Sequence, residues 1–392
     1  MNFNGSLYFN MDQQFIDKIL LIGATLAFFL ATLLLKKKGK ALHDYFISAW
    51  LILLGLYVSI YSFSTADLFI YNPWIINFYI SILFLNGPFL FGYIKALTNS
   101  DYKIGKEMFW HLLPFIIFNL YLIFFFPAKD ILKNACSVHG VSKFELPLPY
   151  FIFLILIAFS VPFYICWSIT LLRKHRKIIS DNFSSLEKRT LTWLRNLISI
   201  LGIVWTILVS IIFIHHVLLL FSDSFCINGL FLTLSAFIIM VGYFGLHQPA
   251  IFTSQNIPSP IVVINKDMPY SGSSLKVDDM QQYLAILNDY MKCEKPYLNN
   301  QLTLYYLAAE VKILPHHLSR IINEHHKQNF FDFINQYRVD EFIKRMSDPQ
   351  FRNYSLLAIA FDCGFNSKTT FNRYFKKVTG FTPSEYKNKS DS

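Results

Sequence analysis

Charged residues are scarce in this sequence. Asp, Glu, Lys and Arg make up 15% of its 392 residues, whereas hydrophobic residues make up 54%. Soluble globular domains carry about 25% charged residues. The shortage argues against a purely soluble protein, and it indicates that much of the chain lies in a lipid bilayer.

Cysteine is scarce as well, and the common metal and catalytic motifs are missing. The five cysteines form no Cys-x-x-Cys pair and no zinc spacing. The histidine pairs 316–317 and 325–326 have no cysteine or carboxylate partners at ligand spacing, so we expect no metal site. The sequence also contains no phosphate-binding glycine loop, kinase motif, His-Glu-x-x-His motif or paired intramembrane carboxylates. We therefore expect no cofactor and no enzymatic activity.

Long apolar runs fill the chain up to residue 250. A membrane-crossing helix needs about 20 mostly apolar residues, and seven stretches approach or exceed this length: 15–35, 44–63, 70–94, 108–126, 150–172, 193–220 and 226–246. The third contains Asn86, Gly87 and Pro88, where we expect a kink. The first is too long for a signal peptide and is followed by KKKGK, so it is expected to be retained. Seven spans would place the two termini on opposite sides of the membrane.

Basic residues are distributed unevenly among the loops. Most of them follow the first, third and fifth stretches: Lys36, Lys37, Lys38, Lys40, Lys95, Lys103, Lys106, Arg173, Lys174, Arg176, Lys177, Lys188 and Arg189. The loops after the second and sixth stretches hold none, and the loop at 127–149 holds few. Basic loops tend to stay in the cytoplasm. The N-terminus is therefore expected outside and the C-terminus inside.

Two pairs of residues near the outer face are candidate functional groups. His215 and His216 lie near the outer end of the sixth stretch, where polar groups are costly unless they have a role. They either sense a ligand or face lipid headgroups. Cys136 and Cys226 both fall on the outer side, where an oxidising compartment permits a disulfide. Two unpaired thiols are the alternative.

The composition changes after residue 250. The segment 251–276 contains proline, serine and glycine without helical periodicity, which is typical of a linker. We therefore divide the chain into a transmembrane sensor domain at 1–250, this linker, and a soluble domain at 277–392.

The soluble domain contains two pairs of short amphipathic helices. Apolar residues recur at helical spacing in 304–311 and 314–322, and again in 356–363 and 371–378. Ser355 and Ser367 stand at positions typical of helix N-caps, and Gly364 lies in the turn of the second pair. Two helices joined by a tight turn form a helix-turn-helix unit. We expect two such units, at about 300–325 and 353–380. The expected fold class is all-α, with a seven-helix transmembrane bundle followed by a cytoplasmic double helix-turn-helix domain.

The segment between the two units predicts a connector helix at 330–346. One face carries Phe330, Phe333, Ile334 and Tyr337, and the opposite face carries Val339, Phe342, Ile343 and Met346. Each face is expected to pack on one unit.

This C-terminal sequence resembles a known family. The segments LTLYYLAAEVKILPHHLSRIINEHHKQNFFDFINQYRVDEFIKRM and YSLLAIAFDCGFNSKTTFNRYFKKVTGFTPSEYK resemble the DNA-binding domain of AraC/XylS-type transcription regulators. The whole arrangement is similar to seven-helix membrane regulators of Bacteroidetes-type bacteria. The first unit departs from the family pattern, because Lys312 and Leu314 stand where the family often has glycine and serine.

The resemblance implies a transcription regulator of the bacterial inner membrane, with a periplasmic N-terminus and a cytoplasmic DNA-binding domain. Recognition helices of this kind enter the major groove. The residues expected to contact base edges are His316, Ser319, Arg320, Lys368, Thr369, Thr370 and Arg373, while Lys376 and Lys377 are expected to hold phosphates. The expected partners are promoter DNA, RNA polymerase, a second copy of the chain and a signal ligand received by the bundle. The alternative is a seven-helix receptor-like or transporter-like protein whose tail recruits a protein partner.

Overall fold

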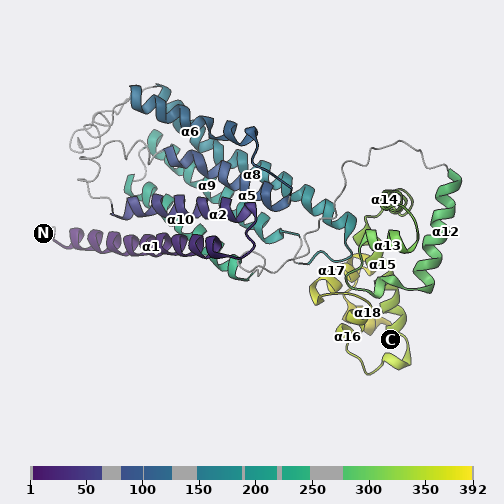
Figure 1. Cartoon of the computed structure of the whole chain (residues 1–392). Coiled ribbons are helices and arrows are strands. Elements are labelled where there is room, and N and C mark those ends of the chain that lie inside the picture. Colours follow the sequence, from purple (N-terminus) through teal and green to yellow (C-terminus); the bar gives the residue numbers. More distant parts are fainter. Residues whose placement is uncertain are drawn as a thin grey trace. The chain divides into compact units, whose positions relative to one another are not determined.

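The computed structural model describes residues 3–63, 81–99, 101–125, 148–187, 190–218, 223–247 and 277–390. Every regular element in these ranges is a helix (Figure 1), which confirms the all-α class. The chain forms two compact units: Met1–Leu172 with Thr192–Ile261, and Arg173–Leu191 with Val262–Ser392. The segment Arg173–Leu191 thus folds with the C-terminal residues, which the sequence did not indicate. The predicted domain boundaries at 250 and 277 stay a prediction.

The first unit is built from apolar helices. They are α1 (Phe3–Lys36), α2 (Leu42–Phe63), η1 (Ile82–Leu85), α5 (Asn86–Thr98), α6 (Lys106–Phe125), α8 (Leu148–Asn182), α9 (Thr192–Leu218) and α10 (Asp223–His247), although α8 continues into the second unit from Arg173.

Five helical segments in the described ranges are long and apolar enough to cross a membrane: Phe15–Lys36, Leu42–Ser62, Lys106–Phe125, Phe151–Asn182 and Thr192–Ile211. The segments Ile82–Thr98 and Asn228–Tyr243 are apolar but shorter. Helical residues therefore occur within each of the seven predicted stretches, and the count of seven spans stays a prediction.

Close helix contacts and polar side chains hold the first unit together. A Cβ atom at Gly92 of α5 would meet the Phe46 ring of α2 at 2.5 Å, so glycine permits this close approach. The indole nitrogen of Trp50 donates to the amide oxygen of Asn86 at 2.9 Å. Asn86 begins α5 directly after the 3-10 turn η1. The helix type therefore changes just before Asn86, and the kink expected at Asn86, Gly87 and Pro88 stays a prediction.

The second unit gathers short helices around α15. They are α12 (Val277–Cys293), η2 (Pro296–Leu298), α13 (Leu304–Glu310), α14 (Pro315–His325), α15 (Phe330–Met346), η3 (Pro349–Phe351), α16 (Leu356–Asp362), α17 (Lys368–Thr379) and α18 (Pro383–Ser390).

Two apolar cores lie on the two faces of α15. The first contains Phe333 and Ile334 together with residues of α12, α13 and α14. The second contains Val339 and Phe342 together with residues of α16 and α17. The connector helix therefore has the predicted bounds and packs one face on each helix pair, as expected. The contribution of α12 to the first core was not anticipated.

Candidate nucleic-acid interface

The second helix pair is defined by two N-caps and a glycine turn. The Ser355 hydroxyl accepts from the Ala358 amide at 3.1 Å, and the Ser367 hydroxyl accepts from the Thr370 amide at 3.3 Å, so both predicted caps are confirmed. Gly364 has φ 93, a left-handed conformation that side chains disfavour. These features fix where α16 ends and where α17 begins.

The turn of the first pair is less regular. Lys312 adopts φ 54, and Leu314 precedes α14 without a side-chain hydrogen bond to the helix. Pro315 then opens α14, a position where its missing N–H is harmless. A lysine thus occupies a left-handed position that suits glycine better, which strains the backbone of this turn.

The predicted DNA-contacting residues of α17 share its outer face. Lys368, Thr369 and Arg373 are exposed, and Thr370 is partly buried. The opposite face places Phe371, Tyr374 and Phe375 in the second core. The aromatic residues of α17 are thus packing residues, and its exposed residues Lys368, Thr369 and Arg373 are available to a ligand from solvent.

The two lysines near the end of α17 have different surroundings. Lys376 and Lys377 are both exposed. The Lys377 ammonium lies 2.9 Å from the Asp332 carboxylate of α15 and 5.2 Å from the ring centroid of Tyr374. Lys377 is therefore attached to the connector helix, which leaves Lys376 better suited to a phosphate.

The predicted residues of α14 form a smaller polar surface. His316 and Arg320 are exposed, and Ser319 is partly buried. The Arg320 guanidinium pairs with Glu324 one turn later, at 2.8 Å. An exposed pair of this kind contributes little stability, so Arg320 can leave it for another acceptor at small cost.

A buried arginine supports the interface from inside. Arg338 of α15 is 1% exposed, donates from Nε to the Tyr297 carbonyl oxygen at 2.8 Å and from Nη2 to the Asn299 carbonyl oxygen at 2.9 Å. Burial lowers the pKa of Arg338 to about 9. The guanidinium thus ties the chain before α13 to the connector helix. Sequence reasoning missed it, although an arginine between two apolar helix faces was a visible signal.

Three of the four outer-face candidates lie in helices, His215 and His216 in α9 and Cys226 in α10. Cys136 lies outside the described residues, and the side chains of Cys226, His215 and His216 are likewise not described. The proposed disulfide and the proposed sensing role of the histidines stay predictions.

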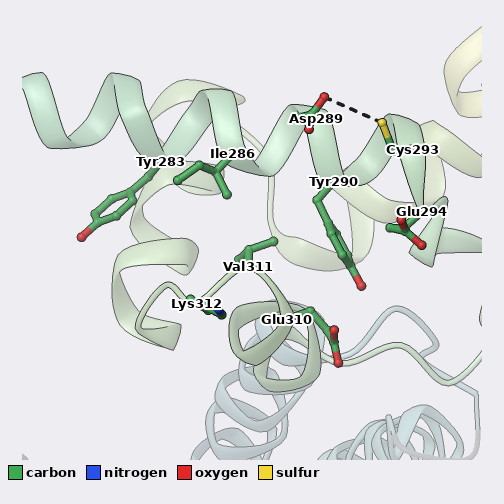
Figure 2. Close-up of a pocket in the computed structure, with 9 residues that line it drawn as sticks. All are labelled: Tyr283, Ile286, Asp289, Tyr290, Cys293, Glu294, Glu310, Val311 and Lys312. Atoms are coloured by element: carbon green, nitrogen blue, oxygen red, sulfur yellow. Dashed lines mark hydrogen bonds between the residues drawn. The ribbon is translucent and has the colours of Figure 1, made fainter.

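A shallow pocket lies between α12 and the end of α13 (Figure 2). It is lined by Tyr283, Ile286, Asp289, Tyr290, Cys293, Glu294, Glu310, Val311 and Lys312. The Cys293 thiol lies 3.8 Å from the Asp289 carboxylate. Three carboxylates and no residue of α14 or α17 line it, so it is unsuited to a nucleic acid. No cluster of three metal-binding side chains occurs in the part of the chain that the structure describes.

Comparison with protein families finds one matching domain. Residues 307–389 match a helix-turn-helix domain family, a span that runs from within α13 into α18. These residues form an AraC-type helix-turn-helix domain. That family is one of DNA-binding regulators and not of enzymes. No curated protein and no solved structure matches the chain. The two helix pairs, their caps and the connector helix thus belong to a DNA-binding architecture.

Proposed function

We propose that this chain is a membrane-embedded one-component transcription regulator, in which apolar helices receive a signal and the helix-turn-helix domain binds promoter DNA. The observation that carries the proposal is the outer face of α17. It presents Lys368, Thr369 and Arg373 to solvent at the start of a capped recognition helix. A helix of this kind reads base edges from the major groove with its N-terminal residues.

The apolar helices support the membrane half of the proposal. Five helical segments in the described ranges have the length and composition of membrane spans. Together with the basic loops of the sequence, they favour an inner-membrane protein with seven spans, a periplasmic N-terminus and a cytoplasmic DNA-binding domain. In this reading the signal ligand acts on the bundle, the regulator binds as a homodimer, and RNA polymerase is the downstream partner.

The competing function is recruitment of a protein by the C-terminal domain. The exposed basic residues of α17 favour DNA, because Arg373 suits the acceptors of a guanine edge and Lys376 suits a phosphate. Mapping of genomic DNA bound by the intact chain in its native membrane tests this choice. We expect enrichment of a small set of promoter fragments with a shared sequence. Uniform recovery of genomic DNA, or none, would favour protein recruitment.

A further inference from the structure

The segment Phe183–Glu187 lies in the second compact unit, although in the sequence it connects α8 to α9. Phe183 forms an antiparallel bridge with Thr303, the N-cap residue of α13. The Ser184 amide donates to the Leu302 carbonyl oxygen at 3.1 Å, and the Ser184 hydroxyl donates to the same oxygen at 2.8 Å. A stretch between two apolar helices is therefore hydrogen-bonded to the helix-turn-helix domain.

Ser184 is the anchor of this segment. It is completely buried, and its carbonyl oxygen accepts from Arg338 Nη1 at 3.0 Å and from Asn335 Nδ2 at 3.4 Å. Its hydroxyl oxygen also accepts from Arg338 Nη2 at 3.1 Å. Every polar atom of Ser184 is thus bonded, and two of the five hydrogen bonds from the Arg338 guanidinium go to it. Buried groups satisfied in this way specify one docked position.

Beyond Ser184 the segment reaches the start of the recognition helix. The side-chain nitrogen Nδ2 of Asn366 donates to the Ser185 hydroxyl at 2.8 Å, and Leu186 packs against the second core. Glu187 Oε1 accepts from the Ser367 hydroxyl, and from the Thr370 hydroxyl at 2.9 Å. A carboxylate therefore lies at the N-terminus of α17, on the N-cap residue and on one residue expected to contact DNA.

The negative charge of Glu187 stabilises the folded domain but opposes the binding of DNA. A negative group is favoured at a helix N-terminus, where amide groups and the helix dipole point outward. The same feature attracts DNA phosphates. Glu187 therefore uses donors that a phosphate would use, and it places a like charge next to the approaching DNA backbone.

We propose that Phe183–Glu187 is an internal inhibitor that docks on the helix-turn-helix domain and must leave the start of α17 before the domain binds DNA tightly. This inference rests on the proposed DNA-binding function. The segment is covalently joined to α8 on one side and to α9 on the other, with the unit boundaries at Leu172 and Thr192. A signal that favours the undocked segment would therefore raise the population able to bind DNA.

The direction of the effect separates an inhibitor from a structural brace. If the segment only supported the domain, weakening its contacts would lower DNA affinity. If it inhibits, the same change raises affinity. Glu187→Gln keeps the size of the side chain and removes its charge, and Glu294→Gln is a matched control because Glu294 is exposed beyond α12.

The first experiment measures DNA affinity of the full chain in lipid nanodiscs. The probe is a duplex that the wild-type chain selects from a random-sequence pool. We expect Glu187→Gln to lower the Kd about tenfold, since a charge-assisted contact and a like-charge repulsion are both lost. Glu294→Gln should change the Kd less than about twofold, because surface substitutions away from contacts have small effects.

A cross-link tests the same idea in the opposite direction. The Ser184 amide donates to Leu302, so Phe183 and Thr303 face each other as a pair without mutual hydrogen bonds. Such pairs have Cα atoms about 4.5 Å apart, within the range that a disulfide spans. The double variant Phe183→Cys, Thr303→Cys should bind the duplex about tenfold more weakly when oxidised than when reduced. Each single-cysteine variant should bind the duplex with the same Kd under oxidising and reducing conditions, which controls for the native cysteines.

The outcomes distinguish the two proposals. Failure of the wild type and of every variant to bind any duplex would overturn the proposed function, and the inference with it. DNA binding by the wild type, with unchanged or lower affinity in Glu187→Gln and equal affinity in the oxidised and reduced double variant, would overturn the inference alone. Tighter binding by Glu187→Gln and weaker binding by the oxidised double variant would establish the inhibitor.

Discussion

The hydroxyl group of Tyr374 on α17 donates to the backbone carbonyl oxygen of Asp332 on α15, at 2.6 Å. The Asp332 carboxylate also pairs with Lys377, one turn further along α17. Helix α17 is thus attached to the connector helix by a hydrogen bond to a backbone oxygen and by an ion pair one turn later. The tilt of its outer face depends on these contacts as well as on the apolar core.

Removal of the Tyr374 hydroxyl should destabilise α17 locally without creating a cavity in the core. Tyr374→Phe keeps the ring and loses one hydrogen bond, which costs about 1 kcal/mol. We expect amide hydrogen exchange in Lys368–Thr379 to become about fivefold faster in the intact chain. Exchange in α12, which contributes to the other core, should stay unchanged. Equal acceleration in both helices would mean that the hydroxyl acts on the whole unit.

Two glycines with left-handed backbones provide a matched pair of substitutions. A Cβ atom at Gly364 would meet the Tyr297 carbonyl oxygen at 2.5 Å and Arg338 Nε at 2.9 Å, whereas nothing lies within 4 Å of one at Gly380. Gly380→Ala should therefore cost only the backbone strain, about 1 kcal/mol. Gly364→Ala adds a steric clash in a buried turn and should cost about 3 kcal/mol or more. Thermal unfolding of the two variants in detergent checks the order, and equal losses would contradict it.

Local sequence patterns predicted the elements of the domain well. Apolar residues at helical spacing predicted the bounds of the connector helix, because a helix that is buried on two opposite faces has a periodic apolar pattern in its sequence. Ser355 and Ser367 were recognised as caps because the cap bond is made within three residues. Features that a residue shares with its near neighbours are therefore readable from the sequence.

Contacts between distant segments produce no comparable pattern in the sequence. Arg338 bonds the Tyr297 carbonyl oxygen 41 residues earlier and the Ser184 carbonyl oxygen 154 residues earlier. The acceptors are backbone oxygens, which any residue supplies, so neither partner has a diagnostic side chain. Glu187 likewise stands beside Lys188 and Arg189 in the sequence, and no local pattern there predicts a contact with the start of α17. The docking of Phe183–Glu187 on the helix-turn-helix domain could therefore be identified only from the structure.

The Glu341 cluster predicts how stability depends on pH. Burial alone would raise the pKa of Glu341, but hydrogen bonds from Arg345 at 2.9 Å and Lys295 at 3.2 Å, with their charges, lower it below the ordinary value of a glutamate. A carboxylate with a lower pKa in the folded state stabilises that state fully above the unfolded value, and the effect is lost as the pH falls through the folded value.

Glu341→Gln should therefore lower the stability of the second unit by about 1–2 kcal/mol at neutral pH. The difference from the wild type should shrink as the pH falls toward about 4 and below. Thermal unfolding at a series of pH values measures this, with the exposed pair member Glu324→Gln as a control of the same charge change. A difference that grows in acid would show that the pKa of Glu341 is raised and not lowered.

The membrane orientation is tested by reporter fusions. Basic loops predict that residues following Lys106 and the C-terminus both lie in the cytoplasm, and that the 127–149 loop lies outside. A cytoplasm-active reporter should be active when fused after Lys106 or at the C-terminus, and inactive when fused after Lys133. A periplasm-active reporter should give the opposite pattern. An external C-terminus would be incompatible with binding of chromosomal DNA.

The last prediction separates base reading from phosphate binding on α17. The Arg373 guanidinium is exposed on the face opposite Phe371 and Phe375, and its planar donors suit the two acceptors of guanine in the major groove. Arg373→Ala should weaken binding of the selected duplex by about 1–3 kcal/mol and relax the preference at one or two base pairs. Lys376→Ala should weaken all sequences alike and reduce the slope of log affinity against log salt by about one.

Binding titrations at several salt concentrations, with the selected duplex and with single-base variants of it, measure both effects. Lys344→Ala on α15 is the control, because it removes one exposed positive charge outside the recognition helices. If α14 and α17 enter successive major-groove segments, the footprint should cover about two helical turns. An Arg373→Ala variant that folds and keeps both affinity and sequence preference would show that α17 does not read bases, and recruitment of a protein partner would become the better explanation of its exposed face.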